Sequence, residues 1–182
     1  ELKLVADVGL VGYPNAGKST FLGAVSAAHP AVAPYPFTTL TPHIGTVEFP
    51  DLGRLTIADL PGLIEGAHRN VGLGYDFLRH AERTRVLAYV LDMAGTDNRD
   101  PLDDFRVLQQ ELEFYQEGLS RRAAIIIANK MDEPVAAENL KRLQPGTSIP
   151  IFPVCAVLNE GTGPVLAALR QLVAQASAAE SS

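Results

Sequence analysis

Eight residues between Gly12 and Ser19 have the types and the spacing of a phosphate-binding loop. They match the pattern G-x-x-x-x-G-K-[ST], follow an apolar run and lead into a helical pattern. In such a loop, backbone N–H groups turn toward a polyphosphate and the following helix directs its positive end at the anion. We expect Lys18 to bridge the outer phosphates and the Ser19 hydroxyl to bind Mg²⁺. The expected contacts in this loop are Gly12, Tyr13, Pro14, Asn15, Ala16, Gly17, Lys18, Ser19 and Thr20.

A second short pattern places a carboxylate near the same phosphates. Asp59-Leu60-Pro61-Gly62 follows a predicted strand. The Asp59 carboxylate would hold Mg²⁺ through a water molecule, and the Gly62 N–H would contact the terminal phosphate. A structural turn is the alternative for so short a pattern, and its position after the phosphate-binding loop favours the functional interpretation.

Two threonines lie in the segment between these patterns. The segment 31–42 contains three prolines and is predicted to be a loop. The hydroxyl of Thr38 or Thr39 would close over the terminal phosphate and the metal, with capping of a turn as the alternative. A loop that the terminal phosphate holds and hydrolysis releases is a switch. The expected contacts here are Phe37, Thr38, Thr39, Leu40 and Thr41.

The run Asn129-Lys130-Met131-Asp132 is a candidate reader of a purine base. The Asp132 carboxylate can accept hydrogen bonds from N1–H and the exocyclic amine of guanine, whereas adenine offers neither donor there, so we expect GTP rather than ATP. Asn129 would contact the purine and brace the loop, and the Lys130 stem would cover the ring. A helix cap after a strand is the alternative. After the last predicted strand, Cys155, Ala156 and Val157 complete the set, with the Ala156 N–H directed at guanine O6.

Composition excludes several other classes of function. The 182 residues carry a net charge of −6, which argues against a general nucleic-acid binder, although a local basic patch remains compatible with it. The single cysteine, Cys155, excludes an intramolecular disulfide and is expected to be a small buried residue rather than a reactive thiol. No apolar run reaches membrane-spanning length. The four histidines lack metal-ligand spacing; we expect surface or structural roles, with only His68 near the chemistry: His29, His43, His68 and His80.

Alternating strand and helix patterns must position these residues. Apolar runs predict strands over 5–11, 44–49, 55–58, 86–91, 123–128 and 149–154, and the prolines of the last favour an irregular or edge position. The turn-rich link over 50–53 suits an antiparallel hairpin between the second and third of these strands. Helical spacing predicts helices from the phosphate loop to about 29, over 101–117 and 138–143, and from 162. The fold class is therefore α/β, a three-layer sandwich with a mainly parallel six-stranded sheet and one antiparallel strand. We expect one domain over 1–176 and a frayed tail over 177–182.

Taken together, these motifs resemble those of the Obg family of ribosome-assembly GTPases, within the Ras-like P-loop superfamily. The resemblance rests on Gly-Tyr-Pro-Asn-Ala-Gly-Lys-Ser-Thr, Tyr-Pro-Phe-Thr-Thr-Leu and Asp-Leu-Pro-Gly-Leu-Ile-Glu-Gly-Ala-His, and on Gly-Leu-Gly followed by Phe-Leu-Arg-His. It implies a GTPase with GTP, GDP and Mg²⁺ as ligands, in which Thr39 is the switch threonine and binds Mg²⁺ with Ser19. It also implies catalytic roles for Lys18, Thr39, Gly62 and Asn15.

The resemblance further implies binding to the large ribosomal subunit or its precursors by a monomer without membrane association. The expected location is intracellular: the cytoplasm of a bacterium, or the mitochondrial matrix or chloroplast stroma of a eukaryote. Obg proteins carry flanking domains that this chain does not contain, so we expect an excised G domain.

Leu63 departs from the Ras-like pattern, in which a glutamine orients water at that place. Slow intrinsic hydrolysis is therefore expected. Related GTPases with an apolar residue there use K⁺, which makes Asn15 a candidate K⁺ ligand; Glu65 is another group that could act on the water. Two alternatives remain open at this point: a P-loop kinase or ATPase acting on a small molecule, and a nucleotide-binding module without useful turnover.

Overall fold

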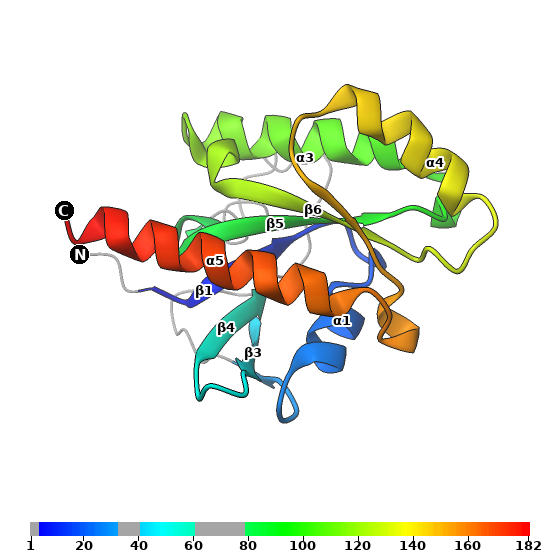
Figure 1. Ribbon diagram of the computed structural model, residues 1–182. Helices are drawn as coiled ribbons and strands as arrows, with labels where there is room; N and C mark the ends of the chain where they lie inside the picture. The colour runs from blue at the N-terminus through cyan, green and yellow to red at the C-terminus, as the bar shows by residue number, and fades with distance from the viewer. Residues whose placement is uncertain (1–3, 33–40, 61–78) are drawn as a thin grey trace.

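The computed structural model describes residues 4–32, 41–60 and 79–182. These residues form a central sheet with helices on both faces (Figure 1). The strands lie in the order β2-β3-β4-β1-β5-β6-β7; β3 runs antiparallel to its neighbours β2 and β4, and the other neighbours pair in parallel. The bounds are β1 (Ala6–Val11), β2 (Ala31–Val32), β3 (His43–Glu48), β4 (Arg54–Asp59), β5 (Thr84–Asp92), β6 (Ala123–Asn129) and β7 (Ile151–Pro153).

The α/β sandwich is thus confirmed, and the strand count is corrected from six to seven in the described part of the chain. The additional strand is β2, which falls in the segment predicted to be a loop. Ala31 pairs with Ile44 and Val32 with His43. A two-residue strand beside prolines has no periodicity of its own and exists because β3 offers it a partner.

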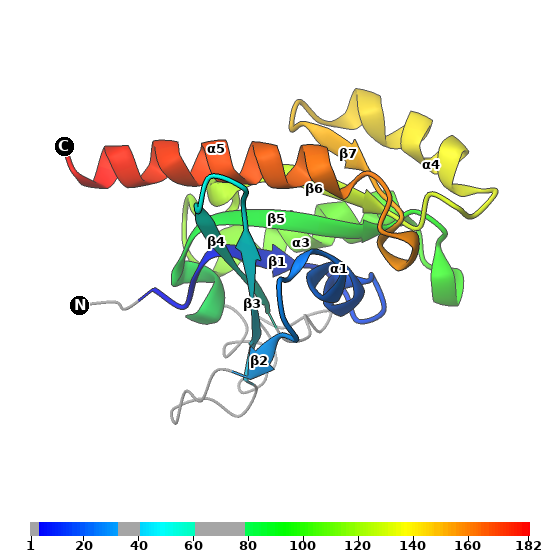
Figure 2. The ribbon, with the colours of Figure 1, turned by 60° about the horizontal axis from the view of Figure 1, so that its bottom comes forward.

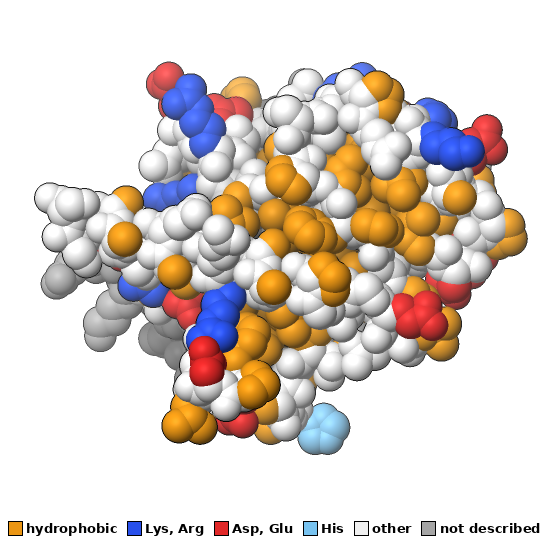
Figure 3. Space-filling view, viewed as in Figure 1, with side chains coloured by type: hydrophobic (Ala, Val, Ile, Leu, Met, Phe, Trp, Pro, Cys, Tyr) orange, Lys and Arg blue, Asp and Glu red, His pale blue; other side chains and the backbone are white. Residues whose placement is uncertain are grey.

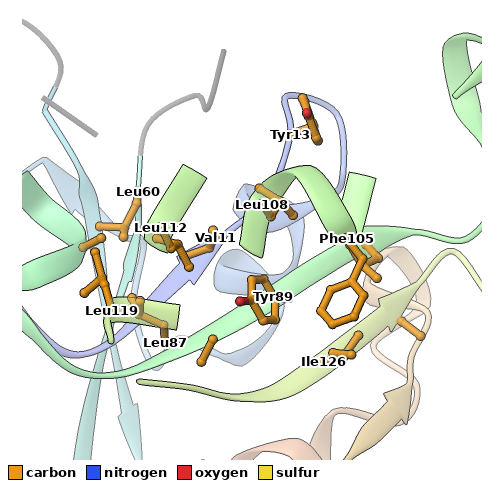
Figure 4. Packing of buried hydrophobic residues seen from close by; sticks show 14 of the residues in the cluster. Val11, Tyr13, Leu60, Leu87, Tyr89, Phe105, Leu108, Leu112, Leu119 and Ile126 are labelled. Carbon is orange, nitrogen blue, oxygen red and sulfur yellow. The ribbon is translucent and has the colours of Figure 1, made fainter. Parts of the chain in front are cut away.

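Four helices form the outer layers of this described region: α1 (Lys18–Val25) and α5 (Thr162–Glu180) on one face, and α3 (Pro101–Tyr115) and α4 (Ala136–Leu143) on the other (Figures 1 and 2). Alternate residues of β5 enter the two hydrophobic cores between the sheet and these layers. Leu87, Tyr89 and Leu91 pack on the α3 side, where Tyr89 meets Phe105 edge-on at 5.1 Å between ring centroids (Figure 4). Val86, Ala88 and Val90 pack on the α1 and α5 side.

The predicted start of α3 is confirmed, whereas the predicted end of α1 is not. Asp100 caps α3, and its carboxylate accepts the Leu102 N–H at 3.1 Å, with Pro101 at the first helical position. The prediction for α1 was too long, because the helix ends at Val25 instead of near residue 29. Ser26 is extended and the Ala27 N–H donates to Thr46 O of β3 at 2.9 Å, so the sheet captures the chain there.

The end of the chain also differs from the prediction. Residues 177–180, expected to be frayed, continue α5 as far as Glu180. Four of the residues between 174 and 179 are alanine, which has the highest helix propensity. The Glu180 carboxylate also accepts a hydrogen bond from Arg85 Nε at 3.3 Å, which ties the last turn to β5.

Strand β7 lies at the edge of the sheet, as predicted. Ile151 and Phe152 are only half-buried, and Figure 3 shows hydrophobic side chains gathered between α4 and α5 on this side of the molecule. Pro150 precedes the strand and Pro153 is its last residue; both lack the N–H group that another strand would need, so the edge is protected against further pairing. No helix in the described ranges is long and apolar enough to cross a membrane.

Candidate nucleotide-binding site

The carboxyl ends of β1, β4, β5 and β6 meet at one edge of the sheet, because these strands are parallel. The phosphate-binding loop, Asp59, Asp92 and Asn129 follow or end these strands. Two adjoining cavities of about 540 and 520 Å³ open at this edge and share Gly17, Thr20 and Lys130 in their linings. This is the place where ligands bind in open α/β sheets.

The first cavity holds the residues predicted to bind phosphate. Besides the shared residues, its lining consists of Pro14, Asn15, Lys18, Ser19, Thr41, His43 and Asp59. Gly17 has a φ of 100° and stands before the first turn of α1, so the N–H groups of that turn have no preceding carbonyls as partners. A Cβ at Gly17 would lie 2.0 Å from Asn129 Nδ2, which explains why only glycine fits there.

A buried lysine and a partly buried aspartate face each other in this cavity. The Lys18 ammonium donates to Gly12 O at 3.0 Å and to Tyr13 O at 3.4 Å, and its Nζ lies 3.9 Å from Asp59 Oδ1. Burial lowers the pKa of Lys18, and the negative charge of Asp59 opposes that effect. Burial likewise raises the pKa of Asp59, against the influence of Lys18 and His43. Burial therefore disfavours the charged form of both side chains when no ligand is bound. A polyphosphate would stabilise the ammonium of Lys18, and its metal would stabilise the carboxylate of Asp59.

The second cavity holds the residues predicted to read the base. Apart from the shared residues, its lining consists of Ala94, Thr96, Asn129, Asp132, Glu133, Cys155, Ala156 and Val157. Asn129 is 3 % exposed and braces two loops: its Nδ2 donates to Ala16 O at 2.9 Å, and its Oδ1 accepts the Ala156 N–H at 3.0 Å. Asp132 lies exposed at this cavity.

The Ala156 N–H has an acceptor within the protein. This N–H, predicted to point at guanine O6, is occupied by Asn129 Oδ1 in this structure. The buried Asn129 amide must be satisfied by nearby groups, and Ala156 is the donor within reach. A contact with the base would require this N–H to be shared between the two acceptors.

Several residues that were predicted to contact the nucleotide do not line either cavity and instead pack in the hydrophobic cores beneath the site. Tyr13, Ala16 and Leu60 are buried in the hydrophobic cores, and Met131 packs against one of them. Figure 4 shows Tyr13 at the end of the loop that leaves β1, above Leu108 of α3. Gly12 lies close to β5, where a Cβ would come within 2.6 Å of Val90 O. Six further predicted contact residues lie outside the described residues, as do Leu63, Glu65 and His68: Phe37, Thr38, Thr39, Leu40, Pro61 and Gly62.

The sequence reasoning missed His43, whose side chain lines the phosphate cavity. His43 pairs directly opposite Asp59 in the β3–β4 hairpin. The signal was present, because the predicted turn over 50–53 sets this register once the two strands are taken as a hairpin. It also missed Ala94, Thr96 and Glu133, of which Ala94 and Thr96 lie in a loop that carries no recognised pattern. His80 is fully buried and His29 is exposed, in agreement with structural and surface roles.

Cys155 is buried at 3 % exposure, as expected, and burial raises the pKa of its thiol. Because the thiolate is the reactive form, we expect iodoacetamide to modify the folded protein at pH 8 at least about ten times more slowly than the urea-unfolded chain. Mass spectrometry of timed samples would measure both rates. Equal rates would show that the thiol is accessible and reactive in the folded protein.

Known proteins resemble this chain over most of its length. Residues 7–130 match the family of 50S ribosome-binding GTPases. The chain is 53 % identical over 178 residues to GTPase Obg of Desulforamulus reducens, covering 96 % of this chain and 42 % of that protein. It is 55 % identical over 178 residues to "Probable GTP-binding protein OBGM, mitochondrial" of Arabidopsis thaliana, covering 95 % of this chain and 36 % of that protein. The chain thus spans less than half the length of these relatives.

Solved structures agree on the fold. The G domain of the FeoB iron transporter of T. maritima superposes with a TM-score of 0.64 at 22 % identity, covering 93 % of this chain and 97 % of that one. The cytosolic domain of the same transporter in a GDP form superposes with a TM-score of 0.69 at 18 % identity, covering 91 % of this chain and 62 % of that one. At such identities the likeness concerns the fold alone. The family match and the curated relatives go further, and by them this chain belongs to the 50S ribosome-binding GTPases and carries a G domain of the Obg type.

Proposed function

We propose that this chain binds GTP with Mg²⁺ and hydrolyses it to GDP and phosphate, as a switch that acts in assembly of the large ribosomal subunit. The observation that carries the proposal is the pair of adjoining cavities, one with the Lys18 ammonium and the first turn of α1, the other with Asn129 and Asp132. Together they match a triphosphate joined to a guanine base.

Lys18 acts on the phosphates, because its ammonium is buried and held by two carbonyls at the mouth of the loop. Ser19 and Asp59 supply hard oxygen donors in the same cavity, which fits Mg²⁺, with Thr39 as a further ligand and Asp59 acting through water. The metal, when bound, neutralises charge on the transferred phosphoryl group. The Gly62 N–H is assigned to the terminal phosphate, and Phe37 to Thr41 to the switch.

Titration with GTP, GDP and ATP, followed by calorimetry, tests the base assignment. GTP and GDP are expected to bind at least about 100-fold more tightly than ATP, because adenine leaves the Asp132 carboxylate unpaired. Equal affinity for ATP would overturn the assignment and favour a P-loop kinase or ATPase of a small molecule.

A K⁺ ion at Asn15 is the proposed substitute for the water-orienting side chain that Leu63 cannot provide. Asn15 lines the phosphate cavity with a φ of 71°, and its Nδ2 donates to Asp97 Oδ2 at 3.5 Å, which leaves Oδ1 as its ligand atom. We expect single-turnover hydrolysis to be at least about tenfold faster in K⁺ than in Na⁺ at equal ionic strength. An unchanged rate would remove K⁺ from the mechanism, and no turnover in either salt would favour a binding module.

The ribosomal role is supported by the family match and by the names of the relatives. Since the chain spans less than half of their length, contacts with rRNA are assigned mostly to segments outside it. The bacterial and mitochondrial relatives support an intracellular location, and a monomer is proposed. Hydrolysis measured with and without large ribosomal subunits tests the role; stimulation is expected with the longer protein, and its absence there would count against an assembly function.

A further inference from the structure

The loop between β5 and α3, residues 92–99, joins the two halves of the nucleotide site although none of the recognised patterns lies in it. On one side it contacts Lys130, which lines both cavities. On the other side it contacts the phosphate-binding loop at Asn15 and Tyr13. The loop therefore touches the base-reading loop and the phosphate-binding loop at once.

The contact with Lys130 has the closest geometry. Lys130 Nζ lies 3.0 Å from Asp92 Oδ2 and donates to Thr96 Oγ1 at 3.1 Å. Asp92 is 8 % exposed, and its two oxygens are fixed by the N–H groups of Ala94 at 2.9 Å and Thr96 at 3.2 Å. The acceptors of the ammonium are thus oriented by the loop itself.

Lys130 is fixed at its other end as well. Its backbone has a φ of 65°, a left-handed conformation that a side chain-bearing residue adopts only where its surroundings impose it. The stem between this backbone and the anchored ammonium lies where the two cavities meet. A flexible lysine would otherwise lose rotamer freedom when a nucleotide bound.

The backbone of the loop over 92–99 is itself held in a defined conformation. Gly95 and Asp97 have φ angles of 66° and 59°, and a Cβ at Gly95 would lie 2.7 Å from Arg99 O. The Arg99 guanidinium lies 3.9 Å above the Tyr13 ring and donates to Asp104 at 2.7 Å, which joins the end of the loop to α3. Both ends of the loop are therefore held.

We propose that Asp92 and Thr96 are positioning residues of the nucleotide site, which hold the Lys130 stem over the place of the purine before the nucleotide arrives. The inference rests on the proposed function and deepens it. Because the base and ribose are common to GTP and GDP, loss of the anchor should weaken both equally and leave the chemical step unchanged.

The test uses Thr96→Val, which removes the hydroxyl, keeps the shape of the side chain and keeps the N–H that fixes Asp92. The dissociation constants for GDP and GTP are expected to rise three- to tenfold together, while the single-turnover rate at saturating GTP stays within about twofold. Thr147→Val is the matched control, because it removes a hydroxyl that accepts the Ile149 N–H next to β7, and it should leave both constants unchanged. Thr96→Ser should restore the parent affinity.

A double-mutant cycle separates positioning from general stability. In a Lys130→Met background, Thr96→Val should change the dissociation constant by less than about twofold, since the group it anchors is absent. A Thr96→Val protein that binds GDP as tightly as the parent overturns the inference, and so does an effect that persists undiminished in the Lys130→Met background. A parent chain that binds no guanine nucleotide overturns the proposed function instead.

Discussion

Replacing Asp132 with asparagine is expected to exchange guanine for xanthine as the preferred base. The asparagine side chain can accept the N1–H of guanine with its oxygen, but its NH₂ group then faces the exocyclic amine of guanine, which is also a donor. GTP and GDP should therefore bind at least about 100-fold more weakly. Xanthine carries a carbonyl in place of the amine and should be accepted by the amide. Competition of XDP and GDP against a fluorescent nucleotide measures the exchange.

Glu133→Gln is the matched control for this change. Glu133 is the next residue and lines the same cavity, so the substitution removes a charge of the same sign at nearly the same place. It should leave the ratio of GDP to XDP affinity within about threefold. If Glu133→Gln produced the same shift as Asp132→Asn, the preference would reflect the local charge rather than hydrogen bonds to the base.

Replacing Asn129 with alanine is expected to damage both stability and binding. The substitution leaves the buried Ala16 carbonyl and Ala156 N–H without the partner that now joins them. Each orphaned buried group costs about 1–3 kcal/mol, so urea unfolding should show a loss of about 2–4 kcal/mol. Because the same side chain aligns the phosphate-binding loop with the last loop, GDP affinity should fall at least about 100-fold.

Asn139→Ala separates these two effects. Asn139 is another buried asparagine, 8 % exposed, and its Nδ2 donates to Met93 O at 2.8 Å, but it lines neither cavity. We expect a comparable loss of unfolding free energy with GDP affinity within about threefold of the parent. Equal losses of affinity in the two variants would mean that Asn129 acts through stability alone.

The sequence by itself determined the features that depend on short spacing. The separation of Gly12, Gly17 and Lys18 predicted a phosphate-binding loop; Gly17 and Lys18 line one cavity, and the Gly12 carbonyl accepts a hydrogen bond from the Lys18 ammonium. Asp100 and Pro101 predicted the start of α3, and the turn-rich link over 50–53 between two apolar runs predicted the β3–β4 hairpin. Since parallel strands end at one edge, the alternation of strands and helices also predicted that the loops carrying Asp59 and Asn129 would lie at the same edge of the sheet.

Only the tertiary structure decided the features that depend on partners far along the chain. The end of α1 and the existence of β2 follow from pairing with β3. The Ala156 N–H donates to Asn129 Oδ1, 27 residues away in the sequence. Contacts of this kind carry no periodicity or spacing in the sequence, because they form only when strands bring separate loops to one edge of the sheet.

The clearest case is the anchor of Lys130. Local sequence marks Lys130 as part of the base-reading pattern but gives no sign that Asp92 and Thr96, more than thirty residues earlier, hold its ammonium. Their positions follow from the parallel pairing of β5 with β6, which sets Asp92 beside Asn129 and turns the next loop toward the nucleotide site. Short motifs in the sequence thus indicate which residues face the ligand. The residues that hold them in place are known only once the pairing of the strands is known.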